Sequence, residues 1–373
     1  MRLQPLVLLL VLLAGCAGLN QSSIDTRFGP ADPARFDRPP VSAKGGISYR
    51  HDVKPVLDSR CVVCHGCYDA PCQLRLGSWD GIARGATNVP VYGELRLREA
   101  PTTRLGIDAQ KPSQWRERGF MAVLNERART PGNDLAASLL YRTLAHKQAN
   151  PMQTGGVLPA DYDFGLNRRD VCAPLEDYDA FEKSKPHGGM PYGLPGLTPR
   201  ETDVIVRWLQ AGAPADPPAP TPPRVAERVR EWEAFLNGDS NKSRLMGRYV
   251  YEHLFLANIT FSEDRGFAFR LVRSRTPPGQ PVVELATRRP FDDPGPDVPR
   301  PYYRLVPDPE TRLAKTQMPF ELSTARMARW RGWFLEPEYT VDRLPDYTPE
   351  VASNPFKAFE AIPMVSRYRF LLD

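Results

Sequence analysis

Two cysteines and a histidine form the most chemically specific pattern in the sequence. Cys61 and Cys64 are three positions apart and His65 follows directly, which gives the spacing C-x-x-C-H. On a helical turn both thiols lie on one face, so they can add to the two vinyl groups along one edge of a porphyrin. The next imidazole can then ligate the iron. The pattern predicts one covalent haem c, held by Cys61, Cys64 and His65, with His65 as the catalytic residue.

Other cysteine chemistry remains open for this segment. Cys67 extends the pattern to C-x-x-C-x-x-C and Cys72 follows, so an iron–sulfur cluster is one alternative. A zinc site is another, although its four ligands usually come as two separated pairs and there is no separate second C-x-x-C. Two local disulfides are the third alternative. If haem takes the first two thiols, a Cys67–Cys72 bridge can form, and Cys172 is then left over.

A second iron ligand is expected far down the chain. Met190 lies in the run His-Gly-Gly-Met-Pro, and this glycine-flanked Met-Pro resembles the methionine loop of class I cytochromes c. The loop precedes a helix that starts with a capping box at Thr198 and Glu201 and stops near Gly212. Met190 is the predicted sixth ligand. His187 is the rival ligand, and a core role for the methionine also stays open.

The first residues have the features of an export signal. Arg2 is followed by the apolar run 6–14, which is too short for a membrane span of about 20 residues and fits a signal peptide. The run ends Leu-Ala-Gly before Cys16, which resembles a bacterial lipobox. We expect a signal peptide at 1–15, lipidation of Cys16 and a periplasmic, lipid-anchored protein. A generic secretory signal is the alternative.

Composition and a proline-rich segment set the domain organisation. Proline is unusually abundant, at 40 of 373 residues, and the formal net charge of +5 is too small for a dedicated nucleic-acid binder. Residues 212–224 read GAPADPPAPTPPR, which is typical of a semi-rigid spacer. The sequence therefore predicts a tether over 16–40, a haem domain over 41–211, a linker over 212–224 and a second domain over 225–373.

The expected fold class is mainly α. We predict a cytochrome c-like haem domain, then the proline-rich linker and a smaller α+β domain. In that last domain the helical spacing of apolar residues predicts helices near 225–236 and 245–256, followed by a strand pair over 268–272 and 282–285 with a turn between. The apolar run at the end of the chain indicates an element cut short, so a truncated form is part of the expectation.

Six segments resemble the fatty acid cis/trans isomerase family. They are CVVCHGCYDAPCQL, GSWDGIARGATNVPVYGELRL, PTTRLGIDAQ, WRERGFMAVLNE, HGGMPYGLPGLT and YVYEHLFLANI. The resemblance covers nearly everything after about residue 45. It implies a periplasmic haem enzyme that converts cis-unsaturated acyl chains of membrane phospholipids, or free unsaturated fatty acids, to trans. Known members are much longer, so the chain resembles an N-terminal portion or a truncated form.

The reaction itself suggests a mechanism. A carbon–carbon double bond rotates only when its π bond is weakened, and the sequence has no NAD, ATP or flavin motif. Transient one-electron oxidation of the double bond by ferric haem permits rotation, and return of the electron completes the cycle. Methionine ligation suits this role because it raises the haem potential. The alternatives are a periplasmic c-type cytochrome for electron transfer, and a lipid-anchored adaptor with a vestigial haem.

Overall fold

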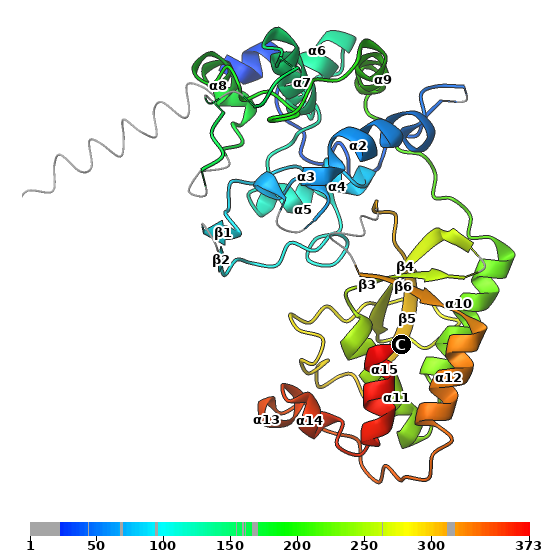
Figure 1. The fold of residues 1–373 in the computed structure, drawn as a ribbon. Helices are drawn as coiled ribbons and strands as arrows, with labels where there is room; N and C mark the ends of the chain where they lie inside the picture. The colour runs from blue at the N-terminus through cyan, green and yellow to red at the C-terminus, as the bar shows by residue number, and fades with distance from the viewer. Residues whose placement is uncertain are drawn as a thin grey trace, which may run out of the picture. The chain divides into compact units, whose positions relative to one another are not determined.

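Two compact units make up the chain. The computed structural model describes residues 23–373 except 44, 68–69, 94–95, 154, 159, 161, 166–170, 263 and 312–317. The units are Met1–Pro218 and Ala219–Asp373, and their boundary falls inside the proline-rich segment 212–224. They are labelled by element in Figure 1. The predicted signal peptide and Cys16 lie outside the described residues.

Unit 1 consists of short helices joined by irregular segments. Its elements are η1 (Tyr49–Val53), α2 (Lys54–Arg60), α3 (Val62–His65), η2 (Pro71–Gln73), α4 (Trp79–Arg84), β1 (Tyr92–Gly93), β2 (Arg96–Leu97), α5 (Pro112–Glu117), α6 (Pro131–Ala136), α7 (Leu139–Ala149), η3 (Leu175–Asp177), α8 (Tyr178–Ser184) and α9 (Pro199–Gln210). The two short strands pair antiparallel. Part of the predicted tether packs onto this unit, since Ile24 and Phe28 are buried against Ala137.

Helix α9 confirms the helix predicted after the Met190 loop. The Thr198 side chain accepts a hydrogen bond from the Glu201 N–H, and the Glu201 side chain accepts one from the Thr198 N–H, which completes the capping box. The buried face of α9 includes Trp208, which is fully buried. Its ring lies 5.8 Å from the ring of Tyr49 in η1. Helix α9 is thereby fixed against the segment that leads into the cysteine motif.

Unit 2 is a four-stranded mixed sheet with helices. The strands are β3 (Ala257–Phe261), β4 (Asp264–Ser274), β5 (Tyr302–Pro307) and β6 (Met318–Leu322), and the helices are α10 (Pro223–Leu236), α11 (Asn241–Leu254), α12 (Thr324–Phe334), α13 (Pro349–Ala352), α14 (Pro355–Ala358) and α15 (Met364–Leu372). The strand order is β5-β4-β3-β6. β4 pairs antiparallel with both β3 and β5, whereas β3 pairs parallel with β6.

The prediction of a mainly α chain with a cytochrome c-like haem domain is wrong. The four-stranded sheet forms the centre of unit 2, and the described part of unit 1 does not establish a cytochrome c-like domain. The predicted strand 268–272 lies within β4, but its main partner is β5. Residues 282–285 contribute only an isolated bridge between Glu284 and Ser274. The parallel partner of β3 lies about 60 residues away in the chain, beyond the reach of local sequence patterns.

Aromatic side chains fill the core of unit 2. Trp330 is fully buried, with its ring 5.4 Å from that of Trp232 and 4.9 Å from that of Phe370. The Phe370 ring also lies 5.2 Å from that of Tyr249. His253 sits beside this cluster and its Nδ1 hydrogen-bonds the Tyr249 carbonyl oxygen at 2.7 Å. Burial lowers the pKa of His253, because the apolar surroundings disfavour the charged form of the imidazole.

Candidate functional site

The cysteine–histidine motif occupies one helical turn. Helix α2 ends at Arg60, and α3 covers Val62–His65 with Cys61 at its N-terminal cap. The backbone N–H groups of Cys64 and His65 both donate to the Cys61 carbonyl oxygen, at 3.1 and 3.0 Å. Cys61 and Cys64 are free thiols. The structure therefore brings two reduced thiols and an imidazole together on a single turn, as the sequence predicted.

The two thiols differ in their surroundings. Cys64 is exposed, whereas Cys61 is half-buried. Burial raises the pKa of the Cys61 thiol to about 12, although neighbouring Arg60 lowers it in part. The Cys61 thiol thus stays protonated at neutral pH. A thioether at this position has no charge to desolvate, so the same burial does not oppose covalent attachment.

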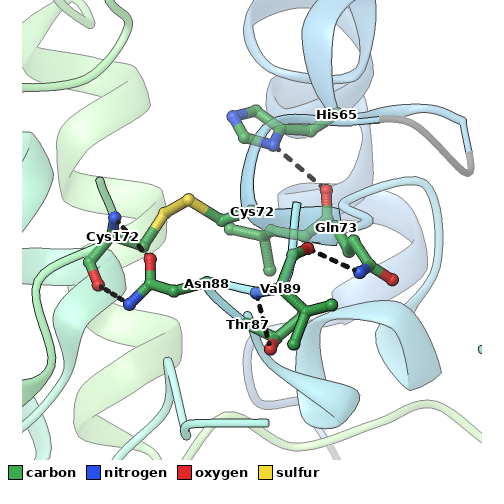
Figure 2. Close-up of a disulfide and its surroundings, with 8 residues drawn as sticks. His65, Cys72, Gln73, Thr87, Asn88, Val89 and Cys172 are labelled. Carbon is green, nitrogen blue, oxygen red and sulfur yellow. Dashed lines mark hydrogen bonds between the residues drawn. A yellow bond between two sulfur atoms is a disulfide. The ribbon is translucent and has the colours of Figure 1, made fainter. Parts of the chain in front are cut away.

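His65 has a defined orientation. Its side chain is buried, and Nδ1 lies 3.0 Å from the carbonyl oxygen of Leu74. A carbonyl only accepts, so Nδ1 donates this hydrogen bond and carries a proton. Figure 2 shows this hydrogen bond beside the disulfide. A histidine that donates one ring N–H to a fixed oxygen is prepared to bind metal through the other nitrogen.

A buried network fixes the backbone that accepts this hydrogen bond. Gln73 precedes Leu74, and its side-chain amide donates to the Val89 carbonyl oxygen at 3.0 Å. The Thr103 hydroxyl donates to Gln73 Oε1 at 2.8 Å. Arg84, only 2% exposed, donates to the backbone carbonyls of both Gln73 and Thr103. The position of the Leu74 carbonyl thus depends on a buried guanidinium.

A disulfide closes the other side of the same segment. Cys72 pairs with Cys172, and their Cα atoms are 6.2 Å apart although 100 positions separate them in the chain. The sequence left the pairing open between Cys67, Cys72 and Cys172, and the structure pairs Cys72 with Cys172 and leaves Cys67 outside the bridge. With Cys72 in a disulfide, it cannot complete a four-thiolate iron–sulfur or zinc site with its neighbours.

Asn88 anchors the far side of the disulfide. Its side-chain amide donates to the Cys172 carbonyl oxygen and its side-chain oxygen accepts from the Cys172 N–H, both at 3.0 Å. Thr87, one residue earlier, donates its N–H to the Cys72 carbonyl oxygen at 2.9 Å. Figure 2 shows the two hydrogen bonds between Asn88 and Cys172 beside the bridge. The segment 87–88 therefore holds both cysteine backbones.

The Met190 loop is packed against helix α7. The Met190 N–H donates to the Thr143 carbonyl oxygen at 2.9 Å, and the methionine side chain is half-buried. Gly189 makes this approach possible, because a Cβ there would clash with the backbone nitrogen of Lys147. The His187 ring lies 4.7 Å from that of Tyr162, with the two planes tilted by 32°. The loop conformation thus requires glycine beside the methionine.

Arg60 links this loop to the cysteine motif. Its guanidinium donates to the Gly196 carbonyl oxygen at 2.6 Å and lies 3.5 Å from the Glu201 carboxylate. The loop before α9 is therefore held beside the residue that precedes Cys61. The structure supports one neighbourhood for the motif and the loop, and it leaves methionine ligation as a prediction.

Sequence reasoning missed the supporting residues. Leu74 acts through a backbone atom, which no side-chain pattern reveals. Gln73 and Arg84 have no motif of their own. Only Cys172 could have been identified from the sequence. Five cysteines follow Cys16, and in an exported protein a cysteine left over from the haem motif is expected to form a disulfide.

Comparison with known proteins adds a family. A family model described as fatty acid cis/trans isomerase (CTI) matches residues 100–373. Neither the curated proteins nor the solved structures include a match to this chain. The matched range contains the Met190 loop and all of unit 2, whereas the C-x-x-C-H motif precedes it. Within the described residues, none of the helices has the length and apolar content needed to cross a membrane.

Proposed function

Because the chain belongs to the fatty acid cis/trans isomerase family and is therefore an isomerase acting on unsaturated fatty acids of lipids, we propose that it works with one covalently bound haem c. The family match supports the reaction class, and it confirms the resemblance found in the sequence. The cofactor rests on a different observation. Two free thiols, Cys61 and Cys64, lie on the same helical turn as His65, whose Nδ1 donates a hydrogen bond to the Leu74 carbonyl oxygen.

The residues present fit a haem. Cys61 and Cys64 would form the two thioether bonds, and His65 would ligate the iron through Nε2. The Leu74 carbonyl makes the imidazole a better electron donor by accepting its Nδ1 proton in a hydrogen bond. Met190 is the proposed sixth ligand in at least one state. When bound, a ferric haem supplies a one-electron acceptor, and brief withdrawal of an electron from the alkene weakens its π bond enough for rotation.

The protein's own residues then have a limited task. Cis-to-trans conversion moves no proton and leaves the double bond at its position, so no general acid or base is required. Cys61 and Cys64 keep the group attached, His65 orients it, and Arg84 with Gln73 keeps the Leu74 carbonyl in place. Electron transfer alone would need the same residues, but the isomerase family match favours the isomerase reaction.

We propose a periplasmic location with a lipid anchor on Cys16. The support is the short apolar run that ends in Leu-Ala-Gly before this cysteine. Palmitate labelling of expressing cells is expected to depend on Cys16. Label that persists in Cys16→Ser would contradict the anchor.

Product analysis tests the proposed function. Gas chromatography of membrane fatty acids from cells expressing the chain should show trans isomers with unchanged double-bond positions. The His65→Ala variant should produce none, and Cys67→Ser, a cysteine outside the haem motif, serves as the matched control. In deuterated water no label should enter the vinylic carbons. Vinylic deuterium, or full activity in haem-free protein, would refute the mechanism.

A further inference from the structure

Helix α15 carries an unusual apolar outer face. Five of its side chains are exposed: Met364 at 76%, Val365 at 44%, Tyr368 at 53%, Leu371 at 63% and Leu372 at 79%. Their spacing of three, four and seven positions places them on one side of the helix. We call these five residues the α15 face. Single exposed apolar residues are ordinary on a protein surface, but a group on one helix face marks an interaction surface.

The opposite side of α15 is firmly packed. Phe370 is 5% exposed and lies against Trp330, with the two ring centroids 4.9 Å apart. The Ser366 hydroxyl donates to the Trp333 carbonyl oxygen at 2.5 Å. Figure 1 draws α15 beside α11 and α12. The α15 face is therefore presented by a helix that the core of unit 2 holds in place.

The end of the helix is held as well. The Asp373 carboxylate pairs with Arg326 at 2.7 Å and with Arg329 at 2.5 Å. It also accepts a hydrogen bond from Trp330 Nε1 at 3.1 Å. These contacts tie the last residue to α12, so exposure of the α15 face does not come from a frayed helix end.

The two helices that form and support this face are rich in arginine. Helices α12 and α15 pack together and contain five arginines, while Asp373 is the single carboxylate side chain among residues 324–334 and 364–373. These arginines are Arg326, Arg329, Arg331, Arg367 and Arg369. Three of them, at positions 329, 331 and 369, are exposed. Apolar side chains next to exposed arginines complement a lipid bilayer, which has an apolar interior beneath anionic headgroups.

We propose that the α15 face docks on a lipid bilayer with anionic headgroups. The apolar side chains enter the boundary between headgroups and acyl chains, and the exposed Arg369 and Arg329 meet the phosphates. This inference rests on the proposed function, since an enzyme for lipid acyl chains must reach the bilayer. A second copy fits less well, because two α15 faces brought together would also bring two arginine clusters together.

Side-chain footprinting tests the docking surface. Hydroxyl-radical oxidation of the full chain is measured with and without vesicles of phosphatidylethanolamine and phosphatidylglycerol. Met364 should become at least threefold less reactive when these vesicles are added, and less so with pure phosphatidylcholine. Met318, 42% exposed on β6, is the internal control and should keep its reactivity.

Two variants make the result decisive. Leu371→Glu with Leu372→Glu should abolish the protection of Met364, since charges replace the apolar contacts. Leu256→Glu is the matched control, because Leu256 is 73% exposed and lies on a different segment, between α11 and β3. It should leave the protection intact.

Three results would overturn the docking surface. They are no protection of Met364 by anionic vesicles, protection that survives the double variant, and protection without lipid that rises with protein concentration. The last would assign the face to a second copy of the chain. The yield of trans fatty acids is measured separately on the wild-type chain. If that chain forms no trans fatty acids but vesicles still protect Met364, the proposed function is refuted and the docking surface is retained.

Discussion

The Nδ1 of His65 lies 3.0 Å from the carbonyl oxygen of Leu74, nine residues further along the chain. This hydrogen bond places a proton on Nδ1 and orients the imidazole ring. Because the acceptor is a backbone atom, the residues that hold the backbone determine how well the histidine is placed. Predictions about the site therefore extend from the motif to its supports.

The first prediction concerns covalent attachment. Haem should remain with the denatured protein after an acid–acetone wash, because two thioethers to Cys61 and Cys64 survive denaturation. Cys61→Ser and Cys64→Ser should each lose covalent haem. Cys67→Ser should retain it. Complete loss of haem from the wild-type chain in the wash would rule out thioether attachment.

The second prediction concerns the sixth ligand. Met190→Ala should remove the weak band at the red edge of the ferric spectrum and lower the haem midpoint potential, since thioether sulfur favours ferrous iron. Met318→Ala in unit 2 is the control and should change neither. An unchanged Met190→Ala spectrum together with an altered His187→Ala spectrum would transfer the role to the histidine.

The third prediction concerns Arg84. Arg84→Gln should cost about 2–4 kcal/mol of unfolding free energy, because it leaves the buried carbonyls of Gln73 and Thr103 without their charged donor. It should also shift the haem midpoint potential through the Leu74 carbonyl and His65. Denaturant unfolding and redox titration measure the two effects.

A surface variant is the control for Arg84. Arg207 pairs with Asp203 on α9 and its side chain is 58% exposed, so Arg207→Gln should cost within about 0.5 kcal/mol. A destabilised Arg84→Gln protein with an unchanged potential would show that Arg84 supports the fold and does not position His65.

The fourth prediction concerns the disulfide. Cys172→Ser should lower the unfolding free energy by about 2–5 kcal/mol, because the bridge closes a long loop. A mild reductant should lower the melting temperature of the wild-type chain to that of the variant and leave the variant unchanged. A reductant effect of equal size in both proteins would assign the stabilisation to other thiols.

The fifth prediction concerns pH. Burial lowers the pKa of His253 below its ordinary value of 6.5, so the unfolded chain binds a proton more readily than the folded one. The stability from this neutral histidine is complete above pH 6.5 and is lost as the pH falls through and below that value. His253→Gln should show a shallower decline of unfolding free energy between about pH 7.5 and 5.5. An unchanged slope in His253→Gln would contradict the assignment.

The structural predictions that the structure confirms, a helical turn at the cysteine motif and the helix α9, rest on local sequence patterns. The C-x-x-C-H turn and the α9 capping box depend on residues within four positions of each other, so spacing alone determines them. The parallel pairing of β3 with β6 and the Cys72–Cys172 bridge join residues about 60 and 100 positions apart. Such contacts are selected by the packing of the whole unit. The buried position of Arg84 could not be predicted either, because arginine is normally a surface residue and only the packing of the whole unit buries this one.

The Cys72–Cys172 bridge also constrains the order in which the protein matures. Cys61, Cys64, Cys67 and Cys72 are synthesised before Cys172, so on the proposed export route they would meet an oxidant first. Short loops close at lower entropic cost than the long loop between Cys72 and Cys172, so pairing within the cluster would compete with the native bridge. Under the proposed haem attachment, thiol–disulfide exchange would then have to return Cys61 and Cys64 to free thiols before a porphyrin is added. On that proposal the yield of mature protein would depend on the disulfide-shuffling capacity of the compartment as well as on the supply of haem.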